Sequence, residues 1–184
     1  MSILSVYQDT APEQPLKVLT HLDDIAATLS EVGIHLERWD ACAPIGANAS
    51  QDEVIAAYRP QIDQLMRQRG CVMVDVLKAD RNEPQKAELC ARFLNEHRYA
   101  GDEVRFFVAG RGLLNFHIEN KVYAVLCERN DLISVPAGTR HWFDMGAHPH
   151  VAVIRLINDP KGWSPEFTGE DIAVHFPRLD DWQG

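Results

Sequence analysis

Four side chains capable of metal or acid–base chemistry gather in one short stretch of the sequence. His97, Tyr99 and Glu103 fall within seven residues, and Arg105 follows two positions after the carboxylate. Another histidine, His141, stands in a separate stretch. Imidazole and carboxylate groups together suit first-row divalent metals, especially iron, nickel or manganese. We therefore take His97, Glu103 and His141 as candidate metal ligands.

The two stretches have the spacing of a paired motif. The first covers residues 96–107, with Gly110 seven positions after Glu103, and resembles the cupin pattern H-x-H-x3-E-x6-G. The second covers residues 130–145 and resembles G-x5-P-x-G-x2-H, with Asn130 in place of the glycine. Asparagine tolerates the left-handed conformation that such a turn needs. In the cupin fold, two hairpins inside a small barrel bring both motifs to one cavity.

The flanking residues extend the resemblance to one family. Glu-His followed by Asp-Glu-Val-Arg-Phe-Phe-Val, and then Val-Pro-Ala-Gly-Thr-x-His-Trp-Phe-Asp-Met-Gly, is similar to the bacterial acireductone dioxygenases from about Lys86 to Phe167. This resemblance implies an enzyme of methionine salvage that oxidises an enediol carrying a methylthio group. It also implies one Fe²⁺ or Ni²⁺ per chain. In this family iron gives formate and 4-methylthio-2-oxobutanoate, and nickel gives carbon monoxide, formate and 3-methylthiopropanoate.

Three charged residues near the motif are candidates for catalytic roles. Arg105 would point into the same cavity as Glu103 if the strand alternates, and its permanent charge would favour the substrate dianion, the role of the matching arginine in the family. Asp102 precedes the ligand and could relay changes in the site. Glu96 precedes His97 and could help to deliver or orient the metal. The alternatives are an ordinary ion pair for the arginine and solvated charges for the two carboxylates.

Three aromatic residues are candidates for the apolar wall around a methylthio tail. They are Phe93, Phe143 and Trp163. The alternative is that they are partly plain core residues. The methionine and aromatic residues between positions 54 and 66 recur at helical spacing and are assigned to core packing.

Tyr99 occupies the position where the cupin pattern has its second histidine. A phenol has a pKa near 10 and places its oxygen further from the backbone than an imidazole places its nitrogen. Tyr99 could bind metal as a phenolate, which favours ferric over ferrous iron. It could swing aside and leave two histidines and a carboxylate, the arrangement of many non-haem iron oxygenases. It could also cripple metal binding. We expect retained binding with weakened affinity.

The element pattern predicts a mainly β protein with a helical N-terminal region. A helix is expected over residues 20–32, ended by Gly33. A second begins at the Ser50–Glu53 capping box and ends at Gly70. A third covers residues 84–94. The expected strands, with a turn at residues 110–112, are residues 71–76, 104–109, 113–118, 121–127, 132–135, 141–144 and 151–157.

These elements indicate one domain of 184 residues, with the fold of a cupin double-stranded β-helix, or jelly-roll barrel. The helical region is expected at about 20–70 and the barrel core at about 71–158. The tail, 159–184, is expected to wrap the outside of the barrel.

The net charge of −9 argues against nucleic acid and against an anionic membrane surface as partners. The four cysteines are scattered without a C-x-x-C pair, so reduced thiols in a cytoplasmic protein are the simplest interpretation. The expected partners are a small-molecule enediol and O₂. The resemblance implies a monomer.

Two further functions stay open on the sequence alone. One is a different cupin oxygenase in which Tyr99 alters the electronics of the metal. The other is a metal-impaired, non-catalytic cupin that binds a small molecule. The acireductone dioxygenase function is favoured over both because Arg105 and the aromatic set accompany the metal motif.

Overall fold

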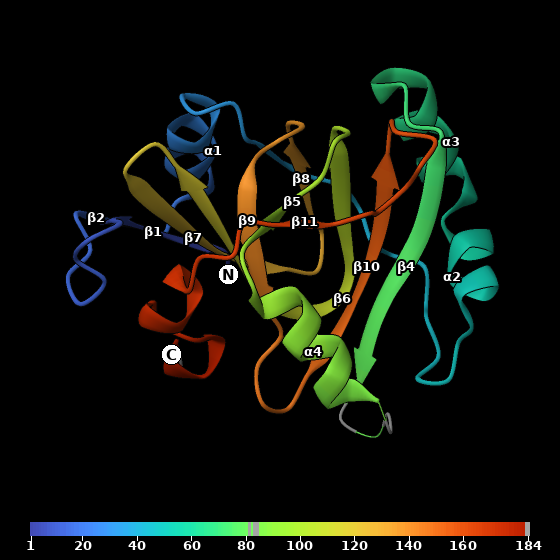
Figure 1. Cartoon of the computed structure of the whole chain (residues 1–184). Helices are drawn as coiled ribbons and strands as arrows, with labels where there is room; N and C mark the ends of the chain where they lie inside the picture. Colours follow the sequence, from blue (N-terminus) through green and yellow to red (C-terminus); the bar gives the residue numbers. More distant parts are fainter. Residues whose placement is uncertain (81, 83–84, 183–184) are drawn as a thin grey trace.

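The structure is a computed structural model that describes residues 1–80, 82 and 85–182. It is built mainly from antiparallel strands (Figure 1). In chain order the strands are β1 (Ile3–Gln8), β2 (Lys17–Leu19), β3 (His35–Arg38), β4 (Met73–Asp80), β5 (His97–Arg98), β6 (Glu103–Ile118), β7 (Lys121–Glu128), β8 (Asp131–Val135), β9 (Arg140–Asp144), β10 (His150–Ile157) and β11 (Glu166–Phe167). The α-helices are α1 (Leu22–Ser30), α2 (Gln51–Ala57), α3 (Arg59–Arg69) and α4 (Lys86–Leu94).

The strands form two sheets that share the long strand β6. Its first half pairs with β8 and β10, and β3 and β4 extend this sheet at its two ends. Its second half pairs with β7 and β9, and the order there is β11-β5-β9-β6-β7-β1-β2. The inner faces enclose a core that includes Phe107, Phe116 and Phe143. This arrangement places β5, β6 and β9, which carry the motif residues, side by side.

Strand β6 continues through the segment for which we expected a turn. The expected turn at residues 110–112 is therefore wrong, because these residues lie within one 16-residue strand. Gly110 has a φ of +66° and lies beside a register shift between Ala152 and Val153 of β10. Such a bulge bends a strand without ending it. The bend is what lets β6 pass from one sheet to the other.

We expect Gly110→Ala to destabilise the protein by about 3 kcal/mol or more, because the substitution combines a strained φ with a steric clash. A Cβ at this position would lie 1.7 Å from the carbonyl oxygen of His150. Urea unfolding of Gly110→Ala and of Gly46→Ala tests this expectation. Gly46 is the matched control, since a Cβ there meets no atom within 4 Å. Equal unfolding midpoints for the two variants would contradict the expectation.

The N-terminal region contains strands as well as the expected helices. Ser50 caps α2 by accepting a hydrogen bond from the backbone N–H of Glu53 (3.2 Å), and Gly70 ends α3 with a φ of +66°. The single helix expected between them is divided at Tyr58, since Pro60 opens α3 and lacks an N–H for a continuous helix. The strands β1, β2 and β3 were not predicted.

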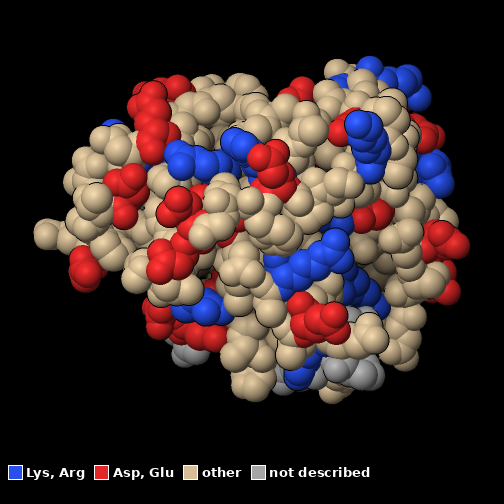
Figure 2. Space-filling view, viewed as in Figure 1, with Lys and Arg blue, Asp and Glu red and all other residues tan. Residues whose placement is uncertain are grey.

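The third expected helix begins, in the described part of the chain, at Lys86, while Pro84 lies outside the described residues. The C-terminal tail packs on one outer face of the protein. Ala173, Phe176 and Leu179 pack against the outer side of the sheet around Trp142. No helix in the described residues combines the length and the apolar character needed to cross a bilayer. Figure 2 shows acidic and basic side chains interspersed on one face.

Candidate metal centre

Three adjacent strands bring the candidate ligands together inside the protein. His97 on β5 pairs directly with His141 on β9, and the two rings lie 4.5 Å apart between centroids. Glu103 is the first residue of β6, and its Oε1 lies 3.4 Å from Nε2 of His141. All three side chains are buried. The pairing of the strands therefore joins two motifs that are far apart in the sequence.

Backbone carbonyls fix both imidazole rings in one tautomer. His97 Nδ1 donates to the Asn95 carbonyl (2.6 Å), and His141 Nδ1 donates to the Thr139 carbonyl (2.8 Å). Burial lowers the pKa of both histidines, that of His141 to about 3. The rings are consequently neutral near pH 7, with the lone pair on Nε2. This is the state in which a histidine binds a metal, with its other nitrogen oriented by a hydrogen bond.

Unpaired polar atoms concentrate at this site. Eight buried side-chain nitrogen or oxygen atoms in the described residues make no hydrogen bond, and five of them belong here. These five are His97 Nε2, Glu103 Oε2, Arg105 Nη1, Arg155 Nη1 and Trp163 Nε1. Buried polar groups normally have partners, so such a cluster indicates bound groups. The two acceptor atoms, His97 Nε2 and Glu103 Oε2, suit a cation, and the three N–H donors suit an anion.

Arg105 binds the candidate ligands directly. Its Nε donates to Glu103 Oε1 (3.1 Å), and its Nη2 lies 3.1 Å from His141 Nε2. Burial raises the pKa of Glu103, but Arg105, the histidines and Arg155 outweigh it, and the pKa lies below its usual range. The described His, Cys, Asp and Glu side chains form no closed group of three around one point. Arg105 contacts both Glu103 and His141 and lies between these two side chains.

Tyr99 lies beside both histidine rings, at 5.2 Å from that of His97 and 5.6 Å from that of His141. Burial raises the pKa of its phenol above the ordinary value, and the opposing effects of Arg105 and Arg155 do not outweigh burial. The pKa effects of Arg105 and Arg155 place both guanidinium groups near its hydroxyl. The phenol therefore lies within the site.

A cavity of about 380 Å³ opens onto this cluster. His97 and Tyr99 form one part of its wall, and Phe93, Trp163 and Arg155 form another. Phe93 and Trp163 therefore contribute aromatic rings to the wall of this cavity. Phe143 does not line the cavity. It is fully buried in the core, with its ring 5.6 Å from the Arg105 guanidinium carbon.

Comparison with known proteins now gives the family. Residues 3–165 match the ARD/ARD' family. The chain belongs to this family. It is 71% identical to the acireductone dioxygenase of Stutzerimonas stutzeri and 66% identical to that of Pseudomonas aeruginosa strain UCBPP-PA14, each over 98% of this chain and the whole of the relative.

A solved structure supports the same assignment. The acireductone dioxygenase from Bacillus anthracis, whose title places a cadmium ion in its active centre, superposes with a TM-score of 0.79 at 25% identity. The match covers 91% of this chain and 98% of that chain. The family predicted from the motifs and the predicted cupin-type fold are both confirmed.

The two acidic residues expected to assist an ARD/ARD' site lie outside its cavity. Glu96 is buried, where its carboxylate accepts from Thr168 Oγ1 (2.7 Å) and lies 2.7 Å from His117 Nδ1. It ties β5 to β6 and to the C-terminal tail. Asp102 is exposed, where it accepts from the backbone N–H of Ala137 (2.7 Å) and from Asn158 Nδ2 (3.1 Å). These contacts fix the backbone on either side of His97 and before Glu103.

The cavity also contains two residues that the sequence reasoning missed. Arg155 on β10 is 7% exposed, and Asp75 on β4 holds it through two hydrogen bonds of 2.9 and 2.6 Å. A signal for Arg155 was present, because one arginine interrupts the apolar strand that covers residues 151–157. A charged residue in a buried strand needs a partner.

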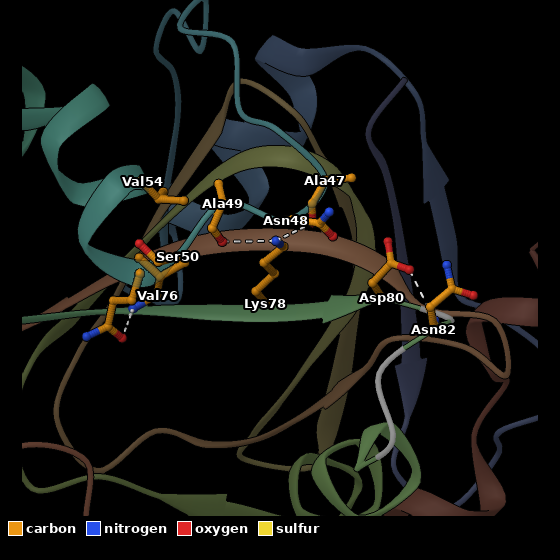
Figure 3. Close-up of a pocket in the computed structure, with 10 residues that line it drawn as sticks. Ala47, Asn48, Ala49, Ser50, Val54, Val76, Lys78, Asp80 and Asn82 are labelled. Carbon is orange, nitrogen blue, oxygen red and sulfur yellow. Dashed lines mark hydrogen bonds between the residues drawn. The ribbon is translucent and has the colours of Figure 1, made fainter.

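Strand β4 borders a second cavity, of about 580 Å³ (Figure 3). Lys78 Nζ donates there to the carbonyls of Ala47 (2.5 Å) and Ala49 (3.1 Å), which fastens the loop before α2 to the strand. None of the unpaired buried atoms in the described residues belongs to this wall. The candidate ligand His97 lines the smaller cavity instead.

Proposed function

We propose that this chain cleaves an acireductone, an enediol with a methylthio tail, with O₂ in methionine salvage. The family membership supports this function, and one observation on the structure carries it. Two neutral, oriented histidines and Glu103 meet two unpaired guanidinium donors beside a cavity. That combination suits an anionic, oxygen-rich substrate held at a cation.

The proposed metal is one Fe²⁺ or Ni²⁺ per chain, bound by His97, Glu103 and His141. The orphaned Nε2 of His97 and Oε2 of Glu103 fit such an ion. When bound, the metal supplies a Lewis acid that can hold two vicinal substrate oxygens. In this proposal Arg105 releases His141 Nε2 to the metal and keeps its contact with Glu103.

Arg105 is proposed to stabilise the deprotonated substrate. It is fully buried, so its charge acts in a medium of low dielectric constant. Its Nη1 donor is unpaired and available to a substrate oxygen. A fixed cation at this position favours the enediolate without reorganisation of solvent.

Tyr99 is proposed to remain a neutral phenol that does not bind the metal. Burial raises the pKa of this phenol, which supports the neutral form near pH 7. The ligand set is then two histidines and one carboxylate, as in many non-haem iron oxygenases. Glu96 and Asp102 are proposed as residues that position the ligand-bearing segments, because they contact backbone and side chains around the ligands.

A cytoplasmic location is proposed because all four cysteines are unpaired.

Oxygen uptake with a synthetic acireductone tests the function. We expect protein loaded with Fe²⁺ or Ni²⁺ to consume O₂ and acireductone at least 100-fold faster than the same concentration of free metal, and to release formate. Carbon monoxide in the headspace distinguishes the nickel outcome from the iron outcome. The control is Arg105→Met, which removes the proposed dianion-stabilising charge and should lower the rate at least 100-fold, the effect of one electrostatic donor. A wild-type rate equal to that of free metal would overturn the proposal.

A further inference from the structure

Arg155 lies at the centre of a row of charges that crosses three strands. The register of β10 places Arg155 opposite Asp75 of β4 on one side and opposite Arg105 of β6 on the other. Two arginines in directly opposed positions repel one another in a sheet. Each is compensated by a separate carboxylate, Arg155 by Asp75 and Arg105 by Glu103.

Asp75 satisfies only one edge of the Arg155 guanidinium. It accepts from Nε and Nη2, at 2.9 and 2.6 Å, and leaves Nη1 buried without a hydrogen bond. If the Arg155–Asp75 pair served only the stability of the fold, it would not need to place a second buried guanidinium beside that of Arg105. An unmade hydrogen bond of this kind costs free energy in the folded protein. The unsatisfied donor therefore indicates a ligand.

Aromatic rings hold the guanidinium at the cavity wall. Its central carbon lies 4.6 Å from the ring centroid of Trp163 and 5.4 Å from that of Phe93, and all three residues line the cavity with His97. These distances are in the range of cation–π interactions. Trp163 Nε1 is a second buried donor without a partner. Two N–H groups from stacked side chains are thus available on this wall.

We propose that Arg155 and Trp163 Nε1 form a second anion-binding element that contacts the enediolate substrate beside Arg105. Asp75 is the positioning residue that orients Arg155. The proposal rests on the proposed function, because the substrate is taken to be an enediolate dianion. Two neighbouring cations, Arg105 and Arg155, then share the charge of its oxygen array. The rings of Phe93 and Trp163 serve both the guanidinium and the apolar tail.

Anaerobic binding separates this inference from the proposed function. The probe is the acireductone that lacks the methylthio group, titrated under argon into metal-loaded protein and followed by its ultraviolet absorbance. We expect Arg155→Gln to weaken binding about 10- to 100-fold, the effect of a charge-assisted hydrogen bond. Arg155→Lys should recover part of the loss, and Asp75→Asn should cause a smaller loss. Trp163→Phe keeps the ring, removes the N–H and should weaken binding about threefold to tenfold.

The matched control is Arg178→Gln. This variant breaks another arginine–aspartate pair, Arg178–Asp144 (2.7 Å), whose residues do not line the cavity. It should leave the dissociation constant within twofold of that of the wild type. Oxygen uptake should show the losses in KM more than in kcat, which a purely structural role would not produce. Metal content and Tm are measured for every variant.

Dissociation constants within twofold of the wild-type value for Arg155→Gln, at equal metal content, would overturn the inference. If Arg155→Gln does not fold, unchanged binding by both Arg155→Lys and Trp163→Phe has the same meaning. Wild-type protein that binds the probe without turnover would overturn the proposed function alone, and Arg155 would still be judged by binding. Wild-type protein that does not bind the probe would overturn both.

Discussion

Replacement of His97 with alanine is expected to leave less than about a tenth of an equivalent of iron or nickel on the purified protein, and to abolish oxygen uptake. The reason is that Nε2 of His97 makes no contact that the folded protein needs, so removal of the imidazole removes a metal ligand first. The loss of affinity should exceed about 100-fold, the upper end of the effect for groups that only orient ligands. Elemental analysis and oxygen uptake measure the two outcomes.

Two further variants make the His97 result interpretable. His97→Gln keeps most of the side-chain volume between Phe93 and Tyr99, so it separates loss of the imidazole from loss of packing. His150→Ala removes an exposed histidine and should keep full metal content. A His97→Ala protein that binds metal as tightly as the wild type would show that His97 is not a ligand.

The sequence could predict that His97, Glu103 and His141 lie close together, because local spacing determines most of their proximity. His97 and Glu103 are close in the chain, and only the β5–β9 pairing was needed to add His141. The contact between Arg155 and Asp75 could not be predicted from local spacing. The two residues are 80 positions apart and meet only through the register of β10 with β4. A pattern along the chain carries no information on that register. The sequence did show Arg155 as a charged residue within an apolar strand, and such a residue indicates a buried partner.

The difference between local spacing and long-range strand register also explains the errors in the predicted fold. Capping and helix-ending residues act locally, so the ends of the segment at Ser50 and Gly70 were predicted correctly. The continuation of β6 through Gly110 was missed, because a glycine between two apolar runs is typical of a turn and also of a bulge. The choice between them is made by β10, whose backbone lies against Gly110. The contacts of Glu96 could not be predicted for a similar reason, since its partners, His117 and Thr168, come from distant segments.

Tyr99→His is expected to raise the affinity for Ni²⁺ about 10- to 100-fold. The Tyr99 ring lies 5.2 and 5.6 Å from the two histidine rings, so an imidazole at this position would lie next to the proposed ligands. It would complete the H-x-H pattern of the first motif and add a neutral nitrogen donor that nickel accepts. Chelator competition gives the affinity for the wild-type protein and the variant. The same substitution changes the cavity wall that Tyr99 shares with Arg155, so KM for the acireductone should change along with the affinity for the metal.

Tyr99→Phe is the control that decides what the phenol does. It keeps the ring and removes only the hydroxyl, so nickel affinity should stay within about twofold of the wild-type value if the oxygen does not bind the metal. Iron-loaded wild-type protein should then lack the visible charge-transfer absorption of an iron–phenolate bond. A large loss of metal in Tyr99→Phe, together with that absorption band in the wild type, would make Tyr99 a ligand. The protein would then bind its metal with two histidines, a carboxylate and a phenolate, and the added negative charge would favour ferric over ferrous iron.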